Sequence, residues 1–139
     1  MYRTKLLVVA NQTVDSDELF ETLHSRAERG PISVTLLVPQ DAQGGLAHRV
    51  RAALDRLHAQ GVEAEAMLGD VDPCVAVIEA WDPRRWDEVV VSTLPTGASR
   101  WQRIGLPQRI ARAVDAPVTH IVCHSVADGR VPAGERVHG

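Results

Sequence analysis

Five short apolar runs recur along the chain and are separated by segments with helical periodicity. The runs cover residues 5–10, 32–38, 62–68, 89–91 and 118–123. Continuous runs of Val, Leu and Ile are typical of strands that are buried on both faces of a parallel sheet. The third run is different, because its apolar residues alternate with Glu63, Glu65 and Met67. We therefore expect that strand to lie nearer an edge of the sheet.

The segment between the first two runs predicts an amphipathic helix. Asp15 followed by Glu18 has the spacing of a capping box, so Asp15 is the expected N-cap. Gly30 is expected to end the helix in the left-handed conformation, and Pro31 prevents its continuation. The apolar face of this helix is formed by Leu19, Phe20, Leu23 and Ala27.

Three later segments also have helical signals. The clearest stripe consists of Leu46, Val50, Ala53, Leu54 and Leu57. The next helix has Asp72 as its expected N-cap and Pro73 as its first residue. We expect Val75 and Ile78 to face the core from that helix. A last helix is marked by Ile110, Ala113 and Val114, after a long loop that begins at Ser92 and runs to about Gly105.

This alternation of strands and helices predicts an α/β fold, with a doubly wound parallel sheet and helices on both faces. The folded unit is expected to span residues 1–124, and residues 125–139 are expected to form a flexible tail. Ligands of such sheets bind beyond the carboxyl ends of the strands, where the winding direction reverses. If the first and fourth strands are neighbours, that crevice contains Asn11, Gln12, Thr13 and the loop that begins at Ser92.

Composition and charge argue against membrane, nucleic-acid-binding and metal-binding functions. The chain has 139 residues, 45% hydrophobic and 24% charged, with a net charge of −3. No apolar run approaches the roughly 20 residues of a membrane span, and the N-terminal run is too short for a signal peptide, so we expect a cytoplasmic protein without membrane contact. The basic residues are scattered among acids, which argues against nucleic acid binding. Cys74 and Cys123 form no CxxC pair and the histidines form no ligand set, so we expect reduced structural cysteines and no metal site.

Several segments, in their order and spacing, resemble the universal stress protein family over roughly residues 4–123. They are an apolar strand ending in a polar turn (6–13), a Gly-Asp turn (69–70), a strand ending in Ser92 before a long loop with Gly105, and the stretch 109–118. The resemblance implies a five-stranded sheet in the order 3-2-1-4-5. It also implies a homodimer, formed here through the last strand, Val118 to Cys123.

The resemblance also defines what this chain lacks. Members of that family that bind ATP carry G-x2-G-x9-G-[S/T] after the fourth strand. Those positions fall on Ser92, Pro95, Gly105 and Leu106, and only Gly105 matches. Proline has no N–H to offer a phosphate, and leucine has no hydroxyl. The acidic residue that often ends the first strand in the family is Asn11 here. The chain thus resembles a divergent member that lacks most of the ATP-binding glycine motif.

Two functions stay open from the sequence. One is a non-catalytic universal-stress-type protein that acts through dimerisation and contacts with a protein partner or an unidentified small ligand. The other is a regulatory protein that binds an adenine nucleotide, ATP or AMP, in a degenerate phosphate loop. Its candidate binding residues are Asn11, Gln12, Thr13, Ser92, Gly97, Ser99, Arg100 and Gly105. Trp101 would stack on a purine or cover the crevice. Enzymatic activity, such as weak ATP hydrolysis, has little support because no base, nucleophile or metal set converges.

Overall fold

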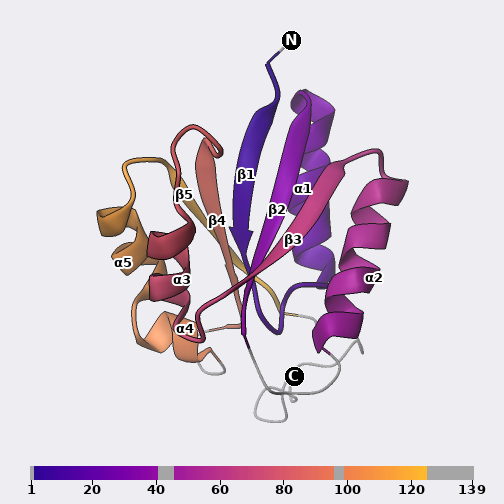
Figure 1. Ribbon diagram of the computed structural model, residues 1–139. Helices are drawn as coiled ribbons and strands as arrows, with labels where there is room; N and C mark the ends of the chain where they lie inside the picture. The colour runs from indigo at the N-terminus through magenta and orange to yellow at the C-terminus, as the bar shows by residue number, and fades with distance from the viewer. Residues whose placement is uncertain (1, 41–45, 96–98, 125–139) are drawn as a thin grey trace.

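Strands and helices alternate along the chain (Figure 1). The computed structural model describes residues 2–40, 46–95 and 99–124, so the tail predicted for 125–139 lies outside the described residues. The elements are β1 (Thr4–Val9), α1 (Asp17–Arg29), β2 (Ile32–Pro39), α2 (Leu46–Ala59), β3 (Glu63–Gly69), α3 (Pro73–Ala80), β4 (Glu88–Thr93), α4 (Arg100–Arg103), α5 (Leu106–Ala113) and β5 (Val118–Val122).

The sheet is parallel throughout and has the order β3-β2-β1-β4-β5, which confirms the predicted fold class and strand order. β1 lies at the centre, with Leu7 paired to Thr35 of β2 and to Val89 of β4. β3 is an edge strand, as its alternating sequence predicts. The winding direction reverses between β1 and β4, so the segments that follow these two strands meet at one edge of the sheet.

Each face of the sheet is covered by helices, and successive residues of the strands face opposite layers. Leu6 and Val8 of β1 pack in the core that includes Phe20 of α1 and Leu57 of α2. Leu7 and Val9 pack in the second core, which includes residues of α3 and α5 such as Val77 and Ile110. Figure 1 shows α1 and α2 on one side of the sheet and α3 and α5 on the other. Burial on both faces explains why β1 is a continuous apolar run.

The two predicted ends of α1 are wrong in detail. Ser16, not Asp15, is the N-cap, and its hydroxyl accepts a hydrogen bond from the Leu19 N–H at 3.3 Å. Asp15 is instead held by Arg49 of α2, as described below. Gly30 ends the helix with φ of 164°, which is extended backbone and not the left-handed conformation.

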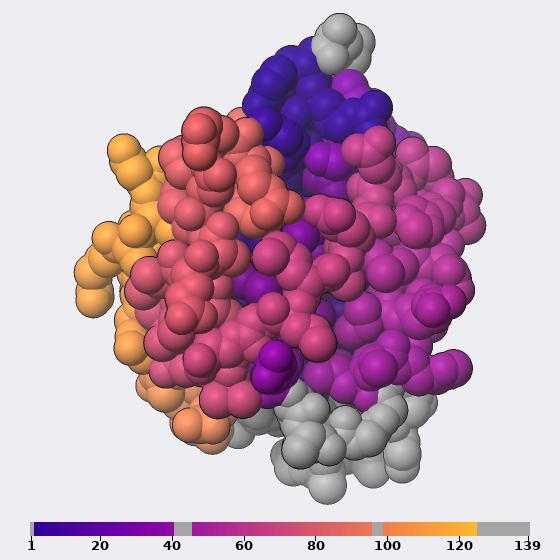
Figure 2. Space-filling view, viewed as in Figure 1, coloured from indigo at the N-terminus to yellow at the C-terminus, as the bar shows by residue number. Residues whose placement is uncertain are grey.

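The N-terminus of α3 is as predicted, but the predicted inner face is wrong. The Asp72 carboxylate accepts hydrogen bonds from the N–H groups of Cys74 and Val75, at 2.9 and 3.2 Å. However, Val75 is 37% exposed and Ile78 is 55% exposed. The inward residues are Cys74, Ala76 and Val77. In the space-filling view the atoms of α3 form part of the molecular surface (Figure 2), as this orientation requires.

Candidate functional site

A pocket of about 120 Å³ opens beyond the ends of β1 and β4, where the winding direction reverses. Its lining residues are Asn11, Gln12, Thr13, Ser92, Thr93, Leu94, Ser99, Arg100 and Trp101. The topology rule thus brings together most of the predicted binding residues, although they come from segments about 80 positions apart. Gly105 was also predicted to bind a ligand, and the structure describes it, but it does not line this pocket. Gly97 was predicted to bind as well and lies outside the described residues.

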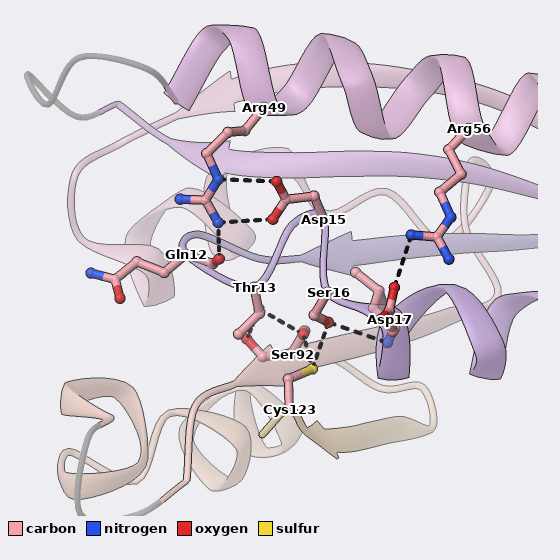
Figure 3. A network of polar contacts seen from close by, with 10 residues as sticks. Gln12, Thr13, Asp15, Ser16, Asp17, Arg49, Arg56, Ser92 and Cys123 are labelled. Atoms are coloured by element: carbon pink, nitrogen blue, oxygen red, sulfur yellow. Dashed lines mark hydrogen bonds and ion pairs between the residues drawn. The ribbon is translucent and has the colours of Figure 1, made fainter. Parts of the chain in front are cut away.

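Two of the lining residues belong to a buried polar network that also includes Ser16 and Cys123 (Figure 3). The Ser16 hydroxyl donates to the Cys123 sulfur at 3.0 Å, and that sulfur lies 3.2 Å from the Ser92 hydroxyl. Ser92 donates to the Thr13 hydroxyl at 2.7 Å, and Thr13 donates back to the Ser92 carbonyl at 3.1 Å. All four residues are at most 2% exposed.

This network satisfies its own polar groups. Burial raises the pKa of the Cys123 thiol, so sulfur keeps its proton at neutral pH. That thiol donates its proton to the Ser92 hydroxyl. The hydroxyl protons of Ser16, Ser92 and Thr13 then all have acceptors inside the protein. Buried polar groups are costly to leave unpaired, and here none is left over for a ligand. Ser92 and Thr13 therefore form part of the pocket wall, with hydroxyls that are already used.

A salt bridge fixes the turn that contributes Asn11 and Gln12 to the pocket. Arg49 of α2 donates to both carboxylate oxygens of Asp15, from Nε at 3.1 Å and from Nη2 at 2.8 Å. Its Nη2 also donates to the Gln12 carbonyl oxygen. Bidentate pairs between arginine and carboxylate are among the stronger polar contacts, and the Asp15 side chain is only 12% exposed. The α2 helix thereby holds the backbone of this turn in place.

Residues 99–105, which the sequence predicts to be part of a long loop, contain the short helix α4 (Arg100–Arg103). Ser99 caps the short helix α4, and its hydroxyl accepts from the Gln102 N–H at 3.1 Å. The Gln102 side chain donates to the Leu94 carbonyl oxygen at 2.7 Å. Gly105 has φ of 68°, a left-handed conformation that favours glycine, and it begins α5. The hydroxyl of Ser99 and the backbone freedom of Gly105 thus serve local folding.

The polar side chains that remain for a ligand are those of Asn11, Gln12 and Arg100. Within the described residues these side chains make no hydrogen bond or ion pair, and Arg100 is exposed. Trp101 is half-buried and also lines the pocket. The pocket therefore presents two amides, one guanidinium and an indole ring. Its volume is below the roughly 300–1,000 Å³ that is typical of small-molecule sites.

Three residues that help to shape this site were not predicted from the sequence as site residues. They are Ser16, Arg49 and Cys123. The preference of helix N-caps for serine is a local signal that identifies Ser16. Arg49 and Cys123 reach the site only through the fold, because Arg49 lies 34 positions from Asp15 and Cys123 lies 107 positions from Ser16.

Within ranges 2–40, 46–95 and 99–124, no group of three or more His, Cys, Asp or Glu side chains is placed to hold a metal ion. None of the helices in those ranges has the length and apolar character needed to cross a bilayer.

No protein-family model and no curated protein matches this sequence. Solved structures of universal stress proteins do match the fold. One such protein in complex with cAMP has a TM-score of 0.60 and 19% identity, over 88% of this chain and 99% of its own. A family protein from Arabidopsis thaliana with AMP bound has a TM-score of 0.61 and 20% identity, over 90% of this chain and 94% of its own. One from Archaeoglobus fulgidus has a TM-score of 0.60 and 15% identity, over 87% and 95%. The chain has the universal stress protein fold.

Proposed function

We propose that this protein is a non-catalytic, universal-stress-type protein that does not bind ATP through the standard phosphate grip. In this proposal it acts in the cytoplasm as a homodimer, through contacts with a protein partner or an unidentified small ligand. The observation that carries the proposal is the Ser92 side chain. Ser92 stands where an ATP-binding member has its first motif glycine, and its hydroxyl is bound to Thr13 and lies 3.2 Å from the Cys123 sulfur.

The other motif positions support the same proposal. Pro95 has no N–H and a fixed φ, so it cannot act as the second glycine of a phosphate loop. Leu106 stands where an ATP-binding member has a hydroxyl, and it is completely buried in the core. Pro107 follows in the first turn of α5 and removes another N–H from that helix terminus. A triphosphate would therefore lack most of the donors that the motif supplies.

A second candidate is an adenine nucleotide with a single phosphate, as the cAMP and AMP complexes of two structural neighbours suggest. The observation in its favour is the set of unpaired groups that line the pocket. Arg100 offers a bidentate donor for one phosphate, and Trp101 offers a ring for stacking on a purine. Asn11 and Gln12 offer amide groups for the base or the ribose. A single phosphate needs fewer backbone N–H donors than a triphosphate, so the missing glycines matter less for its binding.

Calorimetry with ATP, AMP and cAMP separates these candidates. The matched variants are Arg100→Ala, which removes the guanidinium from the pocket, and Arg103→Ala, which removes the same charge from the same helix outside the pocket lining. The first proposal expects no measurable ATP binding at millimolar nucleotide. Binding of AMP or cAMP that is lost in Arg100→Ala and kept in Arg103→Ala would establish the second candidate. Micromolar ATP affinity in the unmodified protein would overturn the first.

The dimer in this proposal rests on a contrast between the two edge strands. β3 carries Glu63 and Glu65, which pair with Arg3 at 3.0 Å and Arg85 at 3.5 Å. Charged side chains of this kind discourage a further strand from pairing. β5 has the sequence Val-Thr-His-Ile-Val and no charged carboxylate, lysine or arginine. The β5 edge is therefore the one suited to a second copy, and sedimentation equilibrium of the full chain at neutral pH tests it.

A further inference from the structure

The open edge of β5 has a defined pattern of free backbone groups. On the inner side, the Pro117 carbonyl accepts from the Val89 N–H at 3.0 Å, and the Cys123 N–H donates to the Thr93 carbonyl at 2.7 Å. Odd-numbered residues of β5 thus point their backbone polar groups toward β4. Because these groups alternate in direction along a strand, Val118, His120 and Val122 point theirs away from the sheet.

Both ends of this edge are closed. The next outward N–H after Val122 belongs to His124, and it already donates to the Glu18 carboxylate of α1 at 2.6 Å. At the other end, the strand begins at Val118, and the residue before it, Pro117, directs its carbonyl toward β4. The edge therefore offers the outward groups of Val118, His120 and Val122 to a partner strand.

A second copy of this chain can use all of these groups in only one antiparallel register. A two-fold axis makes the contact isologous, so a residue and its partner exchange places across the axis. Val118 then pairs with Val122 of the second copy, and His120 pairs with His120 of the second copy. A shift of the axis by one residue in either direction leaves an outward group of Val118 or Val122 without a partner, or pairs it with His124, whose N–H is used.

We infer that β5 binds β5 of a second copy with the two-fold axis at His120, and that protonation of the two facing imidazoles weakens the dimer. This inference rests on the proposed dimer and adds its register and its regulation. The side chains fit the register, because Val118 meets Val122 of the second copy on the α5 side. On the α1 side, Thr119 meets Ile121 of the second copy. Directly opposite residues in such a pair have Cβ atoms about 5 Å apart.

The surroundings of His120 favour its neutral form. Its Nε2 lies 2.7 Å from the Thr93 hydroxyl, and burial lowers the pKa of the ring from its ordinary value. The elements packed around β5 carry these charged or titratable residues: Arg109 and Arg112 on α5, Glu88 on β4, and Asp17, Glu18, Glu21, His24, Arg26, Glu28 and Arg29 on α1. Asp115 lies in the turn between α5 and β5.

Two of these acids already accept hydrogen bonds from other residues. Glu88 accepts from Arg26 and from Thr119, and Glu18 accepts from the His124 N–H. Thr119 and Glu88 lie on the α1 side of the sheet, whereas His120 faces the α5 side, where α5 itself carries arginines and no carboxylate. The helix that covers this face, α5, therefore supplies no counter-charge to relieve the repulsion between two charged imidazoles.

The size of the pH effect follows from this geometry. Two unit charges about 5 Å apart raise a dissociation constant by about fourfold at the dielectric constant of water and by a few hundredfold at an effective value of about 20. We expect the dimer dissociation constant to rise by about tenfold between pH 7.5 and pH 5.5, because imidazole ordinarily titrates near pH 6.5 and this ring titrates lower.

The test is sedimentation equilibrium of the full chain at both pH values and constant ionic strength. His120→Gln is expected to dimerise with little pH dependence, whereas His48→Gln, at an exposed histidine on α2, is expected to keep the wild-type pH dependence. Cross-linking tests the register directly. His120→Cys is expected to form a disulfide dimer under mild oxidant, since facing Cα atoms in a hydrogen-bonded pair lie about 5.5 Å apart. Ile121→Cys, the neighbouring position, is expected to cross-link poorly.

The outcomes separate the inference from the dimer itself. A monomer at both pH values and micromolar concentration would overturn the dimer and this inference with it. A dimer with a pH-independent dissociation constant would overturn the role of His120 and leave the dimer standing. A dimer that cross-links through Ile121→Cys, or through neither cysteine, would overturn the register.

Discussion

Gly69, at the end of β3, is expected to be essential for the packing of α3. A Cβ atom built at this position lies 2.6 Å from the Cβ of Ala76 in α3 and 3.0 Å from Cδ1 of Leu37 in β2. Ala76 and Leu37 are 1% and 0% exposed, so neither has open space beside it. The Gly-Asp turn therefore has a packing reason for its glycine that is independent of any ligand. Gly69→Ala is the perturbation that tests this reasoning.

The magnitude follows from the contact distances. Ordinary carbon contacts lie near 3.5–4.0 Å, so the added methyl group must displace α3 by roughly 1 Å. Overpacking of a tight core costs about 1–3 kcal/mol. We expect about 2–3 kcal/mol for Gly69→Ala, because the obstructing atom is the Cβ of a helix residue and not the end of a flexible side chain. For a chain of 139 residues this corresponds to a decrease in Tm of about 10 °C.

Urea denaturation followed by circular dichroism measures the effect. Gly30→Ala is the control, because no atom lies within 4 Å of a Cβ at that position. Ala76→Gly removes the obstructing methyl group and alone costs about 1 kcal/mol in helix propensity. The double variant is expected to be more stable than the sum of the two single effects by at least about 1 kcal/mol. Additive effects, or a Gly69→Ala protein as stable as Gly30→Ala, would refute the steric explanation.

Two further predictions concern buried polar contacts. Hydrogen bonds from Arg26 hold the pKa of Glu88 below its ordinary value, so the pair stabilises the fold above about pH 4.3 and this contribution is lost as pH falls through the folded-state pKa. Glu88→Gln is therefore expected to cost about 2 kcal/mol at pH 7 and progressively less as the pH falls below about 4, measured by urea denaturation at a series of pH values; a cost that does not change with pH would contradict it. Ser92→Ala is expected to cost about 1–2 kcal/mol because it leaves the Thr13 hydroxyl without its donor, whereas Ser25→Ala on the exposed side of α1 stays within about 0.5 kcal/mol. Equal stability of the two serine variants would show that the network contributes little.

The arrangement of the sheet could be predicted because the strands and helices have local, periodic patterns of apolar residues. The central strands are continuous apolar runs, and the long helices have apolar stripes, so the alternation of strands and helices indicates a doubly wound fold. The strand order came from the resemblance to universal stress proteins. Once β1 and β4 are neighbours, the position of the crevice beside Asn11 and Ser92 follows from topology.

The details that the sequence did not predict depend on contacts between distant segments. Asp15 has the spacing of a cap, but Arg49 binds its carboxylate and leaves the cap position to Ser16. Val75 and Ile78 of α3 are strongly apolar, yet they face outward. The reason is the close approach of Ala76 to Gly69, which turns Ala76 and Val77 toward the sheet. Local propensity is overruled in each case by a tertiary contact.

The residues at the positions of the family's phosphate loop have structural roles of their own in this protein. Ser92, Ser99 and Gly105 lie where a phosphate loop would be, but their hydroxyls and backbone are engaged in the Cys123 network, the cap of α4 and the start of α5. A hydroxyl that is already bonded and fully buried adds little to the binding of an anion, because a ligand would have to replace a satisfied bond. Among the described residues, groups with free capacity are instead the side chains of Asn11, Gln12 and Arg100 at the pocket and the outward backbone of β5. Dimerisation through the β5 edge therefore breaks fewer existing contacts than ligand binding at the positions that correspond to the family's phosphate loop.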